Sequence, residues 1–265
     1  MTTQSIHILS TRPLPAGLIA YAAAFGIGLD TLSFIATARV VDEDLIRGIR
    51  ELALKPLVAV FTSMNAVEAV RGWLMTPPGW KVFCIGSATR GLAADFFGEA
   101  AIAGTAASAR MLAETVRKWE GFGGEGAGGT GGAGGRGGAG GAGPWEAVVS
   151  AGREVYFFCG DRRREELPFL LRREGFTVNE RVVYRTILTP RKVERVYDGI
   201  AFFSPSAVES FFSVNAVAEA TRLFAIGETT AASIGAHCSN PVVISDSPEK
   251  EELVRRMIDY FQLKK

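Results

Sequence analysis

The stretch Phe61-Thr-Ser-Met-Asn-Ala-Val-Glu68 recurs as Phe202-Phe-Ser-Pro-Ser-Ala-Val-Glu209, an offset of 141 positions (61 to 202). A second pair of motifs, Cys84-Ile-Gly-Ser-Ala-Thr89 and Ala225-Ile-Gly-Glu-Thr-Thr230, has the same offset (84 to 225). Two separate motifs that share one offset indicate an internal duplication. The start of each half aligns more loosely, because Gly26 matches Gly175 and Thr37 matches Thr186 at an offset of 149 (26 to 175).

Short apolar segments alternate with helical patterns on both sides of these motifs. We expect strands over 6–10, 57–62, 81–85, 154–159, 199–203 and 222–226, and extended chain over 31–41 and 178–188. We expect helices over 13–25, 42–54, 109–119, 163–173 and 249–261, with two more starting at Met64 and Ala88. This alternation predicts an α/β fold in which parallel sheets are covered on both faces. With the duplication, it predicts two similar lobes and a ligand-binding cleft between them.

The composition excludes several classes of protein. A chain of 265 residues, 48% of them hydrophobic, fits about two domains of ~150 residues and excludes disorder for most of its length. A net charge of +1 argues against a nucleic-acid-binding protein. Three dispersed cysteines and two histidines predict neither a disulfide framework nor a metal site. Without a signal peptide or a long apolar segment, we expect a cytoplasmic protein that does not enter a membrane.

Residues 121–143 are mostly glycine and alanine. Pro144-Trp145 follows them, where a phosphate-binding P-loop needs a Lys followed by Ser or Thr. Collagen is excluded because the segment lacks proline. The composition is typical of a flexible surface insertion.

The repeated motifs place a helix start after each of four strands. Ser63 and Ser204 occupy N-cap positions, and Ile85-Gly86 and Ile226-Gly227 lead into two further helices. Helix N-termini at the carboxyl ends of parallel strands favour anionic ligands. For any single Ser or Thr, ordinary capping is the favoured explanation, and only the recurrence at equivalent places in both halves favours a shared binding cleft. The candidate substrate-binding residues at these ends are Thr62, Ser63, Ser87, Thr89, Ser204, Ser206, Thr229 and Thr230, with Arg12 at the turn after the first strand. Arg162, Arg163 and Arg164 look like a solvated run that opens a helix.

These motifs together resemble uroporphyrinogen-III synthase. The opening Leu9-Ser-Thr-Arg-Pro13 and the later Val183-Tyr-Arg-Thr186 share the resemblance, which covers nearly the whole chain except the glycine-rich segment. Two departures are Glu228, where a proline often precedes the Thr-Thr pair, and the first crossover at Phe34-Ile-Ala-Thr-Ala-Arg39, which lacks the usual proline.

The resemblance implies a chain path. Domain 1 combines residues 1–31 and 189–265, domain 2 comprises residues 42–178, and residues 32–41 and 179–188 form a two-stranded bridge.

We expect the protein to be a monomer. The resemblance also implies the reaction that the protein catalyses. Linear hydroxymethylbilane loses its hydroxyl as water, ring D is inverted through a spiro intermediate, and the macrocycle closes without metal or cofactor. Tyr184, the family's tyrosine by motif, becomes the candidate catalytic acid. From its residues alone, Tyr184 reads as a strand tyrosine with its hydroxyl in water.

Two other functions stay open. Duplicated α/β lobes also describe a non-enzymatic binder of a tetrapyrrole or another carboxylated ligand. The third alternative is a regulatory sensor domain, because related lobes could be fused to effector modules, although the length leaves no room for a DNA-binding helix pair.

Overall fold

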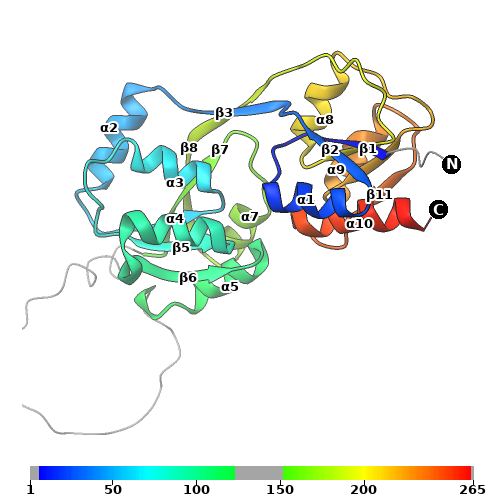
Figure 1. The fold of residues 1–265 in the computed structure, drawn as a ribbon. Coiled ribbons are helices and arrows are strands. Elements are labelled where there is room, and N and C mark those ends of the chain that lie inside the picture. Colours follow the sequence, from blue (N-terminus) through cyan, green and yellow to red (C-terminus); the bar gives the residue numbers. More distant parts are fainter. Residues whose placement is uncertain (1–5, 123–151, 264–265) are drawn as a thin grey trace, which may run out of the picture. The chain divides into compact units, whose positions relative to one another are not determined.

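The structure, a computed structural model, describes residues 6–122 and 152–263. The chain forms two compact units (Figure 1): unit 1 comprises residues 1–36 and 186–265, and unit 2 comprises residues 37–185. Strands β3 (Ile35–Arg39) and β8 (Thr177–Leu188) each contain one of the two boundaries.

Unit 2 is a mostly parallel sheet with helices on both faces, and its edge strand β3 runs antiparallel to β8. After β3 come α2 (Glu43–Leu52), β4 (Val58–Phe61), α3 (Met64–Arg71), β5 (Lys81–Ile85), α4 (Ser87–Phe97), η1 (Glu99–Ala101), β6 (Ile102–Ala106), α5 (Ala109–Lys118), η2 (Glu120–Phe122), β7 (Glu154–Gly160), α7 (Glu166–Arg173) and β8. The strand order is β3-β8-β7-β4-β5-β6. Successive residues of a strand point to opposite faces, so Phe61 packs with α3 and α4, and Val60 packs with α5 and α7.

Unit 1 repeats this plan. Its elements are β1 (Ile6–Ser10), α1 (Ala16–Ala24), β2 (Ile27–Thr31), β9 (Gly199–Phe202), α8 (Pro205–Phe212), β10 (Arg222–Ala225), α9 (Glu228–Gly235), β11 (Val242–Ile244) and α10 (Lys250–Gln262). The sheet order is β11-β10-β9-β1-β2. One face buries Ile8 and Phe224 against α1 and α10, and the other buries Phe202 against α8 and α9.

The duplication is visible in the strand register. Val58 pairs with Lys81 in unit 2, and Gly199 pairs with Arg222 in unit 1. Each residue of the second pair lies 141 positions after its counterpart in the first (58 to 199, 81 to 222). Helices α3 and α8 start at Met64 and Pro205, which keep the same offset. The predicted α/β class, with two mostly parallel sheets from a duplicated unit, is therefore confirmed.

The looser match between Gly26 and Gly175 also has a structural basis. Each glycine follows a helix and precedes a strand, and their φ angles are 73° and 83°. Side-chain-bearing residues rarely adopt this left-handed conformation, which commonly ends a helix.

Several predicted boundaries were wrong. The first helix starts at Ala16 rather than Pro13, because a residue that precedes proline avoids helical dihedrals and Leu14 precedes Pro15. The predicted extended segment 31–41 is split: β2 ends at Thr31 and β3 begins at Ile35. Strands β6 and β11 were missed.

Most of the glycine-rich segment lies outside the described residues. Its predicted start at Gly121 was too early, because Phe122 is buried and its ring packs edge-to-face against Trp119 and Phe176. In the parts of the chain that the structure describes, no helix is both long and apolar enough to cross a membrane.

Candidate functional site

In unit 2, two helices begin where neighbouring strands end. Ser63 caps α3, and its hydroxyl accepts a hydrogen bond from the Ala66 N–H at 3.4 Å. Gly86 is the N-cap residue of α4, with Ser87 as the first helical residue. Because β4 and β5 are adjacent and parallel, these helix starts lie at the same edge of the sheet.

Unit 1 has the same arrangement of helix starts at the edge of its sheet. Ser204 caps α8 and accepts from the Ala207 N–H at 3.2 Å, while Gly227 precedes α9. Arg12 follows β1, the neighbour of β9, and its guanidinium lies 5.5 Å from the centre of the Phe203 ring. The predicted caps at Ser63 and Ser204 are confirmed, as is the placement of two helix starts in each unit.

The predicted substrate-binding residues differ in exposure. The side chains of Thr89, Ser206 and Thr230 are buried, with no more than 8% of each residue exposed. The more accessible ones are Arg12, Thr62, Ser63, Ser87, Ser204 and Thr229. Substrate contact stays a prediction for all nine, as does the cleft.

Tyr184 lies at the corresponding edge of unit 2. It is on β8 opposite Gly160, the last residue of β7, and the register shifts there because Cys159 pairs with Val182 while Gly160 pairs with Tyr184. The Tyr184 carbonyl accepts from the Asp161 N–H at 3.2 Å. Such irregularities turn a side chain relative to a regular ladder, and they are frequent beside active sites.

The ring of Tyr184 lines a hollow of about 350 Å³ that the sequence had not predicted. Its other lining residues are Thr37, Ala38, Arg39, Asn65 and Glu68. They come from β3 and α3, which are brought together with Tyr184 only when β3 pairs with β8. The extended pattern of β3 gave no reason to single out Arg39.

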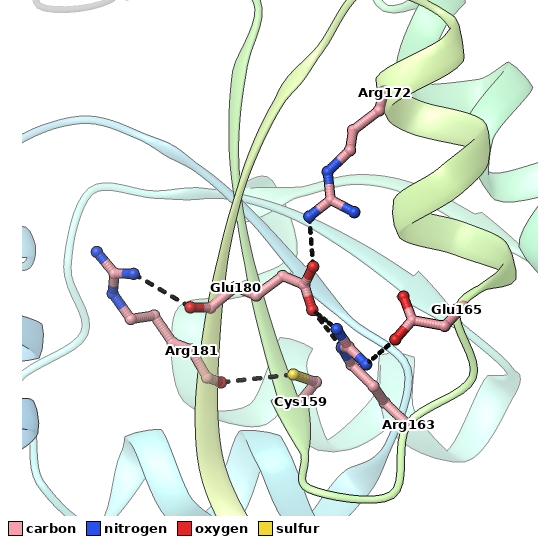
Figure 2. Close-up of polar contacts among 6 residues, drawn as sticks. All are labelled: Cys159, Arg163, Glu165, Arg172, Glu180 and Arg181. Carbon is pink, nitrogen blue, oxygen red and sulfur yellow. Dashed lines mark hydrogen bonds and ion pairs between the residues drawn. The ribbon is translucent and has the colours of Figure 1, made fainter.

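A network of charged side chains braces the first half of β8 (Figure 2). The carboxylate of Glu180 binds the guanidinium groups of Arg163 and Arg172, and Arg163 also reaches Glu165 at 2.6 Å. Burial of the Glu180 carboxyl opposes ionisation, but the hydrogen bonds from the two arginines outweigh it and lower its pKa below the ordinary value.

This network corrects the expectation for Arg163. Helix α7 starts at Glu166, three residues later than predicted, so Arg163 lies in the loop after β7. Only 22% of its side chain is exposed. The run was expected to be solvated, but the carboxylate of Glu180 draws Arg163 against the sheet.

Two buried cysteines supply no nucleophile. Burial raises the pKa of the Cys84 and Cys159 thiols to about 12, so both stay protonated at neutral pH. The thiolate is the reactive form of cysteine, and these thiols are therefore inert packing groups.

Known proteins resemble this chain in both sequence and fold. Residues 142–255 match the family model described as uroporphyrinogen-III synthase HemD. The fold is similar to that of the uroporphyrinogen-III synthetase of Helicobacter pylori, with a TM-score of 0.62 at 14% identity over 96% of this chain and 99% of that one. Over residues 142–255 the chain is therefore similar in sequence to uroporphyrinogen-III synthase, and its fold is similar to that of a solved synthetase.

A second solved structure has a similar fold. A mutant uroporphyrinogen III synthase from the extremely thermophilic bacterium Thermus thermophilus gives a TM-score of 0.56 at 14% identity, over 98% of this chain and all (100%) of that one. No curated protein matches the chain by sequence. The family model covers Tyr184 and the second copy of the repeated motifs, which links the sequence resemblance to the edges described above.

Proposed function

We propose that the chain is a uroporphyrinogen-III synthase, a cyclising hydro-lyase of tetrapyrrole and haem biosynthesis. Its substrate is hydroxymethylbilane, which loses water and closes to uroporphyrinogen III with ring D inverted. The observation that carries the proposal is the position of Tyr184. The family's tyrosine lies at the carboxyl edge of a parallel sheet and lines a hollow.

The two sheet edges suit a substrate with eight carboxylates. The first N–H groups of a helix have no partner within the helix, and the helix dipole adds a positive end. Ser63 and Ser204 satisfy one such N–H each, which leaves others for ligand oxygens. We therefore assign substrate binding to the accessible polar residues at these edges, with Thr89, Ser206 and Thr230 shaping the helix starts from within.

Tyr184 is proposed as the acid that protonates the departing hydroxyl. No hydrogen bond to its phenol is found among the described residues, so the group is available to a ligand. Phenols are weak acids. An electron-rich pyrrole already weakens the bond to its hydroxyl, so modest proton donation suffices. The enzyme's larger task is to hold the bilane in the conformation that closes with inversion.

The other expectations are proposals of the same account. We propose that the protein acts as a cytoplasmic monomer, takes this small molecule as its partner, binds no nucleic acid and uses no metal or cofactor.

The product isomer tests the function. Fresh hydroxymethylbilane is incubated with the protein, the products are oxidised, and the uroporphyrin isomers are separated. The III isomer should predominate, with and without a chelator, whereas spontaneous closure gives the I isomer. A product mixture equal to that of the protein-free control would leave a non-enzymatic binder or sensor as the better explanation.

A further inference from the structure

The hollow beside Tyr184 carries two opposite charges. Arg39 enters it from β3, and Glu68 enters it from α3, together with the neutral polar side chains of Thr37 and Asn65. All of these residues belong to unit 2. At about 350 Å³ the hollow is of the size that holds one small ring with its substituents.

Arg39 is an exposed residue whose guanidinium has no acidic partner among the described residues. Its guanidinium lies over the backbone of Gly72, the C-cap residue of α3, so closely that a Cβ at Gly72 would be 1.8 Å from Nη1. Across residues 6–122 and 152–263, no carboxylate lies within ion-pair distance of Arg39. By contrast, Arg163 and Arg172 are both satisfied by Glu180.

Each pyrrole ring of the bilane offers groups that match this pair. Its acidic side chains are anions that a guanidinium binds well, often through two hydrogen bonds. Its ring N–H is a donor that a carboxylate accepts. An unpaired arginine and an acid in one hollow therefore suit a single ring that carries both kinds of group.

Resting on the proposed function, we propose that this hollow is the subsite for one pyrrole ring of hydroxymethylbilane. Arg39 binds a carboxylate side chain of that ring, and Glu68 accepts the hydrogen bond of its N–H. Tyr184 forms the wall against which the ring lies.

The test compares Arg39→Gln with a matched control. Arg110→Gln removes an equal charge from an exposed position on α5 of the same unit, for which the described residues likewise provide no ion-pair partner. We expect Arg39→Gln to raise KM for hydroxymethylbilane about five- to tenfold, because an exposed charged hydrogen bond contributes modestly. Arg39→Lys should recover part of the loss. Arg110→Gln should keep the wild-type KM, and the melting temperatures of all three variants should match the wild type.

A binding measurement separates affinity from turnover. Uroporphyrin III, the oxidised product, is titrated against each variant by fluorescence quenching, and the dissociation constant should rise for Arg39→Gln and for Glu68→Gln but not for Arg110→Gln. If the wild type yields no III isomer, the proposed function fails. If the wild type yields it and both Arg39→Gln and Glu68→Gln match the wild type in KM and dissociation constant, the subsite is overturned while the function stands.

Discussion

The ring of Tyr184 lies directly against Gly160. A methyl group at Gly160 would come within 2.5 Å of Cζ and 2.8 Å of the hydroxyl oxygen of Tyr184. Gly160 ends β7 at the shift in register, so both the backbone irregularity and the missing side chain determine where the phenol lies. The proposed acid therefore depends on a residue that has no reacting group of its own.

Gly160→Ala is expected to displace the phenol. A distance of 2.5 Å between the new Cβ and Cζ of Tyr184 requires the ring to move. The hydroxyl then leaves the position from which it is proposed to donate its proton. We expect kcat to fall by about tenfold or more, because a displacement near 1 Å can cost a hundredfold. The measurement is steady-state turnover of hydroxymethylbilane, with the III isomer counted separately.

Gly91→Ala is the matched control for that substitution. Gly91 lies inside α4, and its added Cβ meets no atom within 4 Å. Alanine should keep wild-type turnover and raise the free energy of unfolding by up to about 1 kcal/mol. If Gly160→Ala also keeps wild-type turnover, the position of the phenol is not controlled by this contact.

Tyr184→Phe removes the hydroxyl and keeps the ring against Gly160. We expect kcat to fall roughly tenfold to a hundredfold, at or below the low end for a positioned general acid, because the substrate assists its own dehydration. The melting temperature should stay unchanged, since the phenol makes no hydrogen bond within the described residues. If Tyr184→Phe keeps the wild-type kcat and KM at the pH optimum, the phenol is not the acid. The proton then comes from water or from the substrate's own carboxylates.

The repeat predicted much of this fold. One offset, from Phe61 to Phe202, fixed which strands are equivalent, and the parallel register follows it. Short or small-residue strands escaped prediction: β11 has three residues, and β6 reads Ile-Ala-Gly-Thr-Ala. Such segments have little periodicity, and only pairing with a neighbouring strand defines them.

The site was predictable only in part. The capping serines follow from local chemistry, and Tyr184 follows from a motif. The hollow does not, because Arg39 and Asn65 meet only when β3 pairs with β8, which no local pattern encodes. Arg163 was misjudged for the same reason, since its partner Glu180 lies 17 positions away on β8.

Ser63→Ala and Ser204→Ala test the duplicated caps. Each should lower the free energy of unfolding by about 0.5–2 kcal/mol, because one helical N–H loses its acceptor. Ser87→Ala should change it by less than about 0.5 kcal/mol, since Ser87 is exposed and is not the cap of α4. Urea denaturation measures all three, and equal stability of the cap variants and Ser87→Ala would remove the capping role.

Glu180→Gln should make stability less dependent on pH. The folded-state pKa of Glu180 lies below its ordinary value, so its ion pairs stabilise the fold above that ordinary value and lose their effect as pH falls through the folded-state pKa. At pH 7 the variant should lose about 1–3 kcal/mol of unfolding free energy. The difference should shrink below about pH 4. A difference that is constant from pH 7 to pH 3 would contradict the role of the charged pairs.

The isomer ratio made from hydroxymethylbilane tests the central claim most directly. Wild-type protein should convert the bilane to mainly uroporphyrinogen III, Tyr184→Phe should do so more slowly, and added chelator should change neither result. The I isomer alone, formed at the rate of the protein-free control, would contradict the account.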